Sequence, residues 1–129
     1  MSYNKTASNA MLRKAQEKLL SAKDDFNAGR YDSCIGNLYY SAFQTVTSLL
    51  LIRGILINKH THVRGFVNKE LALTGLINKD QAKLYNKLME YRSDADYNNE
   101  VFFEKDIAEE LLNGVELFNE SIKILITLE

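Results

Sequence analysis

The stretch Y-D-S-C-I-G-N-L-Y-Y-S-A-F-Q-T-V-T-S-L-L-L-I-R, residues 31–53, decides the fold. One apolar stripe along it consists of Ile35, Leu38, Ala42 and Leu49, and a second, offset stripe consists of Tyr39, Phe43, Val46 and Leu50. A helix that is apolar on two faces packs on two sides. Residues 31–53 are therefore predicted to form the central helix, with Gly54 as its stop because glycine accepts the left-handed turn that ends a helix.

Four further segments carry apolar residues at helical spacing. Helices are predicted at about Ser8–Ala28, His62–Leu73, Asn78–Asp96 and Lys105–Leu128, with Thr61 as the cap of the second of these. Short connections favour antiparallel neighbours. The chain is therefore predicted to be an all-α, antiparallel bundle of four to five helices, forming a single domain over residues 1–129.

Composition supports this fold class and limits the function. The 129 residues include no proline and six glycines, fewer turn-forming residues than sheet-rich domains usually need. The net charge of −1 gives no global positive field to hold a long nucleic acid, although a local site or a basic surface made by oligomerisation stays open. The polar first ten residues do not resemble a signal peptide, and the longest apolar run, Leu49–Ile52, is far short of the ~20 residues of a membrane span. A cytoplasmic protein with no membrane contact is expected, and its one cysteine, Cys34, is predicted to be a buried, inert thiol.

The end of the fourth helix carries unusual charges. Arg92 and Asp96 are one turn apart and can form an exposed ion pair. Alternatively, Arg92 is held by carboxylates so that it can contact a phosphate. The residues by themselves favour the ion pair, and both readings stay open.

Two histidines share the stretch Lys59-His60-Thr61-His62. No third ligand stands at metal-binding spacing, so no metal site is predicted. With Lys59 beside them, the histidines suggest either a small anion-binding corner at a helix start or imidazoles that cap or pack. Tyr40 lies off the main apolar stripe and is a candidate to line a site, whereas Tyr39 is expected in the core with its hydroxyl bonded at the edge. No phosphate loop or catalytic triad is present in the sequence, and no cofactor is predicted.

Several short pieces of sequence, in their order and spacing, resemble the small stand-alone prokaryotic branch of the HEPN domain superfamily over nearly the whole chain. They are A-x-x-D…G-x-Y-D at Ala22–Asp32, YYSAF at Tyr39–Phe43, Leu50 with Gly54, Lys59–His62, Phe66, Thr74–Leu76, and Arg92-x-x-Ala95-Asp96-Tyr97. The resemblance implies a bundle of about five helices, often dimeric and often encoded beside a minimal nucleotidyltransferase as a toxin–antitoxin-like pair. Many members are metal-independent RNA endonucleases, whose motif is an arginine followed after four to six residues by a histidine, the two brought together across the dimer.

This chain departs from that motif. Arg92 matches the arginine, but Tyr97 stands after four intervening residues, and no histidine follows at Asn98, Asn99 or Glu100. The histidine transfers a proton while the RNA 2′-hydroxyl attacks, and a phenol with a pKa of about 10 is a poor substitute. Standard nuclease activity is therefore not expected, and a binding protein is favoured over an enzyme.

The leading hypothesis is a HEPN-type module that binds a nucleotide or RNA and acts with a nucleotidyltransferase-like partner in a toxin–antitoxin-like system. Its expected ligand-binding residues are Arg92 on phosphate, Tyr97 for stacking or hydrogen bonding, His62 and Lys59 for positive charge, and Asp96 and Tyr40 beside them.

Two alternatives remain. The first is a metal-independent RNA endonuclease toxin that uses Arg92 and a non-standard base, His62. The second is a purely structural, dimerising bundle that scaffolds a nucleotidyltransferase partner. A homodimer is expected in each case.

Overall fold

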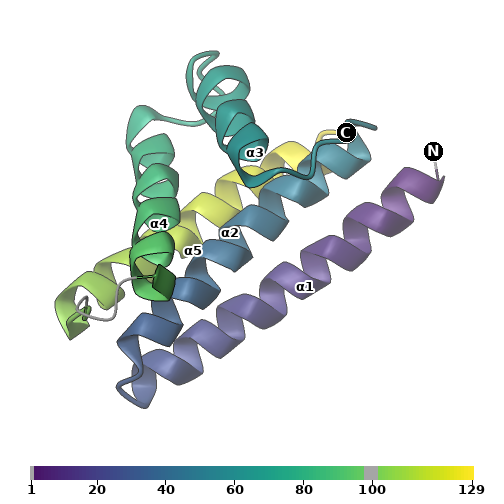
Figure 1. The fold of residues 1–129 in the computed structure, drawn as a ribbon. Helices are drawn as coiled ribbons and strands as arrows, with labels where there is room; N and C mark the ends of the chain where they lie inside the picture. Colours follow the sequence, from purple (N-terminus) through teal and green to yellow (C-terminus); the bar gives the residue numbers. More distant parts are fainter. Residues whose placement is uncertain (1, 98–101) are drawn as a thin grey trace.

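A computed structural model describes residues 2–97 and 102–129 of the chain, without the side chains of residues 2, 3, 95 and 96. The described residues form helices and no strand, which confirms the all-α class (Figure 1). The elements are α1 (Ser2–Asn27), α2 (Tyr31–Ile52), α3 (His60–Phe66), the π-helical segment η1 (Val67–Ala72), α4 (Lys79–Tyr97) and α5 (Lys105–Thr127). None of these described helices is both long enough and apolar enough to cross a membrane.

Three long helices, α1, α2 and α5, lie lengthwise together, and α4 crosses them at the side where α3 also lies (Figure 1). The short connection between α1 and α2 makes these two helices antiparallel, as expected. In contrast, α2 and α5 run parallel. Near their first residues, the Phe103 amide donates to the Asp32 carboxylate at 2.9 Å, and near their last residues Arg53 pairs with Glu129 at 3.5 Å. The α3–α4 excursion returns the chain to the beginning of α2, which allows this parallel pair.

The central position predicted for α2 is confirmed. Both of its apolar stripes are internal, with Phe43 half-buried and the other members fully buried. It contacts α1, α3, α4 and α5. Gly54 ends the helix at φ +73°, and the Ile55 amide then reaches back to the Leu50 carbonyl at 2.9 Å, as in a glycine-based helix stop.

Small residues set the register between α1 and α2. They recur every seven residues on both helices, at Ser8, Ala15 and Ala22 on α1 and at Cys34, Ser41 and Ser48 on α2, and all six are buried. The hydroxyls of Ser8 and Ser48 lie 2.8 Å apart, and the Ser41 hydroxyl donates to the Ala15 carbonyl at 2.8 Å. Small side chains let two helix backbones approach closely. The Cys34 thiol is buried as predicted, and burial, together with the charge of Asp25, raises its pKa to about 11.

Two predicted helix starts were wrong. The first helix begins at Ser2 rather than Ser8, nearly two turns earlier, because α2 continues alongside it and the Ser8–Ser48 contact holds this part of α1 against α2. The third helix begins at His60, and Lys59 rather than Thr61 occupies the cap position, with no side-chain hydrogen bond.

The end of the third helix also differs from the prediction, because the α-helix changes at Val67 into the π-helical segment. Within it, the Asn68 side chain donates to the Arg64 carbonyl at 2.8 Å and pairs with Asn86 of α4. That carbonyl is the acceptor that the Asn68 amide would use in an α-helix. Further on, Asn78 and Gln81 bond reciprocally in a capping box, which confirms the predicted start of α4.

Candidate functional site

Arg92 on α4 meets two consecutive tyrosines of α2. Its Nη2 donates to the Tyr40 hydroxyl at 2.7 Å, and its guanidinium carbon lies 5.6 Å from the ring centroid of Tyr39 and 5.3 Å from that of Tyr40. A guanidinium within about 6 Å of a tyrosine ring is attracted to its face. The tyrosines thus hold a half-buried cation in one orientation. The side chain of Asp96 lies outside the described part, so the ion pair predicted for it remains a prediction.

Arg92, Tyr39 and Tyr40 belong to a group of side chains, the Arg92 cluster, that also includes Phe43, Tyr85 and His60. His60 is the first residue of α3. Its ring stacks on Phe43 at 4.2 Å and 10°, and its Nδ1 lies 2.5 Å from the Tyr39 hydroxyl. It also meets the Tyr40 ring edge-on at 6.1 Å. Burial and the nearby positive charge of Arg92 lower the pKa of His60 below its usual 6.5, so the imidazole is neutral at pH 7.

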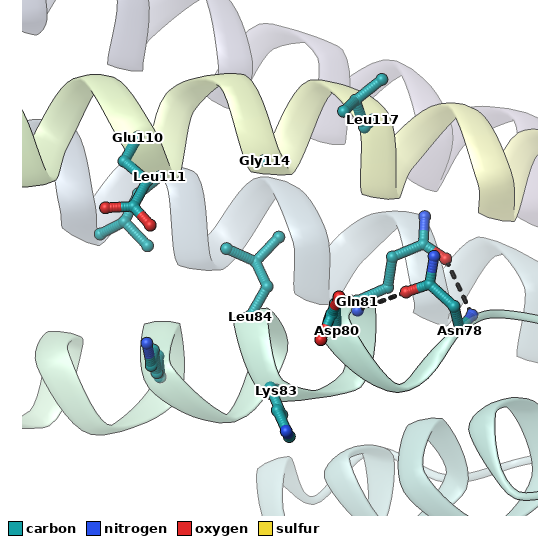
Figure 2. Close-up of a pocket in the computed structure, with 10 residues that line it drawn as sticks. Asn78, Asp80, Gln81, Lys83, Leu84, Glu110, Leu111, Gly114 and Leu117 are labelled. Carbon is teal, nitrogen blue, oxygen red and sulfur yellow. Dashed lines mark hydrogen bonds between the residues drawn. The ribbon is translucent and has the colours of Figure 1, made fainter.

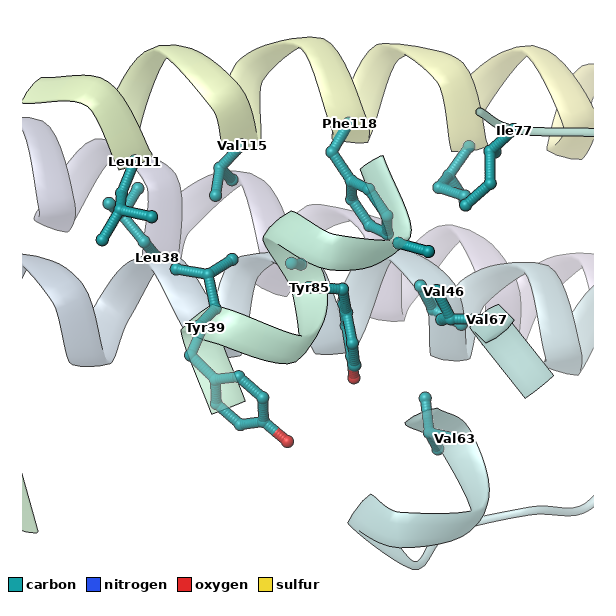
Figure 3. Packing of buried hydrophobic residues seen from close by; sticks show 14 of the residues in the cluster. Leu38, Tyr39, Val46, Val63, Val67, Ile77, Tyr85, Leu111, Val115 and Phe118 are labelled. Carbon is teal, nitrogen blue, oxygen red and sulfur yellow. The ribbon is translucent and has the colours of Figure 1, made fainter. Parts of the chain in front are cut away.

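Tyr39, which contacts the imidazole, has a second buried tyrosine beside it. Tyr39 and Tyr85 are fully buried, and their ring centroids are 6.0 Å apart. Figure 3 shows both hydroxyls pointing away from α5. Burial raises the pKa of each tyrosine, so both stay protonated at neutral pH. The expected role of Tyr39, a core ring with its hydroxyl bonded at the edge, agrees with this position.

The other predicted site residues lie on the surface. Lys59, His62 and Tyr97 are exposed, Tyr97 by 79%. None of the described contacts of Arg92 involves them. The histidine that the structure brings to Arg92 is His60 rather than His62. His62 was the predicted site residue, because sequence alone does not tell which of the two histidines reaches Tyr39 on the preceding helix.

A cavity of about 290 Å³ lies between α3 and α4. Its lining includes Arg64, whose Nη1 lies 3.9 Å from the Met89 sulfur, together with Glu90, Ser93 and Asp94. Arg64 adds a second cation near the cluster, although Glu90 and Asp94 offset its charge.

A larger cavity, of about 440 Å³, lies between α4 and α5 (Figure 2). Leu84 faces Gly114, where an added Cβ would lie 3.0 Å from a Leu84 methyl carbon. Gln81 donates to Ser121 at 2.7 Å across the two helices. The charged lining mixes both signs and consists of Asp80, Lys83, Lys87 and Glu110. No predicted site residue lines this groove, and it concentrates neither charge nor aromatic rings, so the Arg92 cluster is the stronger candidate site.

Two aspartates of the A-x-x-D…G-x-Y-D piece have structural roles. Asp25 is buried and accepts hydrogen bonds from Arg30 at 2.9 Å, Ser33 at 2.7 Å and Asn37 at 2.9 Å. Burial by itself would raise the pKa of Asp25, but these hydrogen bonds and the Arg30 charge together lower it. Asp32 accepts from the Phe103 amide just before α5. This piece of sequence therefore joins helix ends rather than building the site.

The Arg92 cluster offers a fixed guanidinium, an imidazole and aromatic faces. Such groups bind phosphate oxygens and stack with nucleobases. Within residues 2–97 and 102–129, no three potential metal ligands from His, Cys, Asp or Glu side chains gather at one point.

Known proteins are similar to this chain in sequence and, in one solved structure, in fold. Residues 8–125 match the HEPN domain family. A UPF0332 protein of Thermotoga maritima is 35% identical over 114 residues, covering 88% of this chain and 86% of that protein. MJ0142 of Methanocaldococcus jannaschii, which is named as a candidate toxin, is 31% identical over 118 residues, covering 91% of this chain and 80% of that protein. The crystal structure of TT1696 from Thermus thermophilus matches with a TM-score of 0.77 over 92% of this chain and 97% of that one; at 16% identity this likeness concerns the fold alone.

Proposed function

The chain belongs to the HEPN domain family, and on that basis we propose that it is a toxin-like module whose Arg92 cluster binds the phosphate of a nucleotide or RNA. It acts with a nucleotidyltransferase-like partner protein and lacks the standard nuclease activity. Relatives that are named as candidate toxins support the toxin-like part. The absence of a histidine at residues 97–99 argues against the standard nuclease chemistry.

The observation that carries the proposal is the fixed position of Arg92. Its guanidinium is half-buried, donates to Tyr40 at 2.7 Å and lies over two rings, so little side-chain freedom remains to be lost on binding. A planar guanidinium can hold a phosphate in a bidentate manner. Tyr97, which is exposed at the end of the same helix, would stack with a base. The exposed Lys59 and His62 would add positive charge.

Titration with adenosine and guanosine nucleotides and with short single-stranded RNA tests binding. We expect Arg92→Ala to weaken binding about tenfold or more, because a charge-assisted hydrogen bond is worth roughly 1.5–3 kcal/mol. Arg13→Ala is the matched control, since Arg13 is an exposed cation on α1, and it should bind as the wild type does. Absence of binding, or equal affinity of the Arg92 and Arg13 variants, would contradict the proposal.

A second candidate is an endoribonuclease with an unconventional proton-transfer group. The contacts favour His60 over His62 for that role, because His60 lies in the Arg92 cluster and is neutral at pH 7. Incubation of the purified protein with RNA would then give fragments, and His60→Ala would abolish cleavage while His62→Ala would not. Intact RNA after prolonged incubation rules this candidate out.

The partner and the homodimer are further parts of the proposal. Co-expression with the product of a neighbouring nucleotidyltransferase gene should give co-purification, and light scattering of the isolated chain should give twice the monomer mass. If the partner binds the Arg92→Ala variant unchanged and no nucleotide binds the wild type, the purely structural scaffold becomes the better description.

A further inference from the structure

We propose that Tyr85 and Tyr39 are positioning residues that keep the proton of His60 on Nε2, so that His60 donates a hydrogen bond to a phosphate oxygen beside Arg92. The orientation of the imidazole is a property of the free protein. The binding step rests on the proposed function.

The Tyr85 hydroxyl lies in the core and needs an acceptor for its proton. Tyr85 is fully buried, and its hydroxyl oxygen makes no hydrogen bond of acceptable geometry with the described residues. A buried hydroxyl proton without an acceptor is costly. The Tyr39 oxygen is close enough to influence the pKa of Tyr85, after the larger effect of burial, and both hydroxyls point to the same side (Figure 3). A small side-chain movement lets Tyr85 donate to Tyr39.

The direction of the hydrogen bonds follows from this need. If Tyr85 donates to the Tyr39 oxygen, the Tyr39 proton is left for its other neighbour, Nδ1 of His60 at 2.5 Å. The reverse order would have His60 donate to Tyr39 and Tyr39 donate to Tyr85, leaving the Tyr85 proton unsatisfied in the core. Only the first order satisfies every buried proton, and it makes Nδ1 of His60 an acceptor.

The consequence appears at the other ring nitrogen. A neutral imidazole whose Nδ1 accepts must carry its proton on Nε2. Nε2 of His60 makes no hydrogen bond with a described side chain, and it is not completely buried. It is therefore open to a ligand. Nε2–H and the Arg92 guanidinium are both donors. A site built from two donors takes an anion such as a phosphate oxygen and disfavours a cation.

This arrangement also distinguishes two roles of histidine. A general base needs a lone pair facing its substrate, and an Nε2–H group does not present one. A donor role can be fulfilled by glutamine, whose amide N–H₂ reaches a position similar to Nε2, whereas a base role cannot. The conservative variant His60→Gln therefore separates binding from proton abstraction.

The first test is the tautomer of His60 in the free protein, read from long-range proton–nitrogen correlation spectra of the ¹⁵N-labelled chain above neutral pH. We expect Nε2–H in the wild type and a mixture of tautomers in Tyr39→Phe and, to a smaller extent, in Tyr85→Phe. Tyr91→Phe is the matched control, because this α4 tyrosine contacts Phe103 outside the cluster. An Nδ1–H tautomer in the wild type, or an Nε2–H tautomer unchanged in both cluster variants, overturns the positioning role.

The second test is titration with inorganic phosphate, followed on the same spectra. His60→Ala should bind about tenfold more weakly, and His60→Gln should bind within about threefold of the wild type. Arg13→Ala, which removes an exposed cation on α1 outside the cluster, should be unchanged. If His60→Gln binds as weakly as His60→Ala, the donor role is overturned. If phosphate does not bind the wild type although the tautomer is Nε2–H, the proposed function and the binding step are overturned, and the positioning role stands.

Discussion

Asp25 connects α1 to α2 through three hydrogen bonds to one buried carboxylate. We expect Asp25→Ala to lower the free energy of unfolding by about 2–4 kcal/mol, because three donors lose a charged acceptor. Since the folded-state pKa lies below 3.8, the carboxylate stabilises the protein above that pH, and the contribution is lost as pH falls through the folded pKa. Urea denaturation at several pH values measures both effects.

The adjacent Asp24 provides the control for Asp25, because its side chain is exposed. Asp24→Ala should change the free energy of unfolding by less than about 0.5 kcal/mol. Equal losses in the two variants would mean that the Asp25 hydrogen bonds add nothing beyond charge.

His60 makes the free energy of unfolding depend on pH near 6.5, well above the acidic range in which Asp25 acts. Its folded-state pKa lies below 6.5, so the unfolded chain binds the proton more tightly. The contribution of the neutral His60 imidazole to stability is therefore fully present above pH 6.5, and it decreases as pH falls from there toward the folded-state pKa. The free energy of unfolding of the wild type should fall as pH is lowered below 6.5, and His60→Gln should remove much of that slope. His62→Gln should keep it, and a slope that follows His62 instead would contradict this assignment.

At the residue scale, the sequence pointed to individual residues but not to the contacts between them. Arg92 and Tyr40 were each predicted to line a site, and they meet at 2.7 Å. Their contact joins residues 52 positions apart, which no local pattern reports. His60 and His62 are two positions apart in sequence, and tertiary contact with Tyr39 and Phe43 decides between them.

At the scale of the helix, the small-residue register of α1 against α2 gives a sharp prediction. Ala15 is 1% exposed, and the Ser41 hydroxyl bonds to its carbonyl. Ala15→Leu would add three carbons where the helices touch, and overpacking of this kind costs about 1–3 kcal/mol. Gln16→Leu introduces the same leucine side chain on the exposed face of α1. It should change the free energy of unfolding by less than about 0.5 kcal/mol. Comparable urea midpoints for the two variants would contradict the close approach.

Helix existence was predictable here, and helix ends were predictable only where the signal is local. Gly54 and the Asn78–Gln81 capping box are local, and α2 and α4 have nearly the predicted bounds. The start of α1 and the change to π-helix at Val67 depend on contacts with α2 and α4. Hydrophobic periodicity contains no information about such contacts, so the early start of α1 and the π-helical segment were not predicted.

At the scale of the whole molecule, the Arg92 cluster joins a strongly packed part to a weakly packed one. Tyr39 and Tyr40 lie on α2, the most enclosed helix, and Arg92 lies on α4. His60 begins α3, which has only seven residues and continues into π-helical turns. Short helices with few neighbours open locally at low free-energy cost. Amide hydrogen exchange should therefore be slowest in α1 and α2 and faster in α3 and η1.

A bound phosphate should change that pattern in one direction. If His60 and Arg92 hold the same anion, the ligand links α3 to α4, so local opening of α3 requires the ligand to leave. Exchange in α3 should then slow when a nucleotide that binds is added, while α1, which lies away from the cluster, should exchange as before. In Arg92→Ala the same nucleotide concentration should leave α3 unprotected. Protection of α4 without α3 would show that the anion is bound by Arg92 without His60, and would confine the site to α2 and α4.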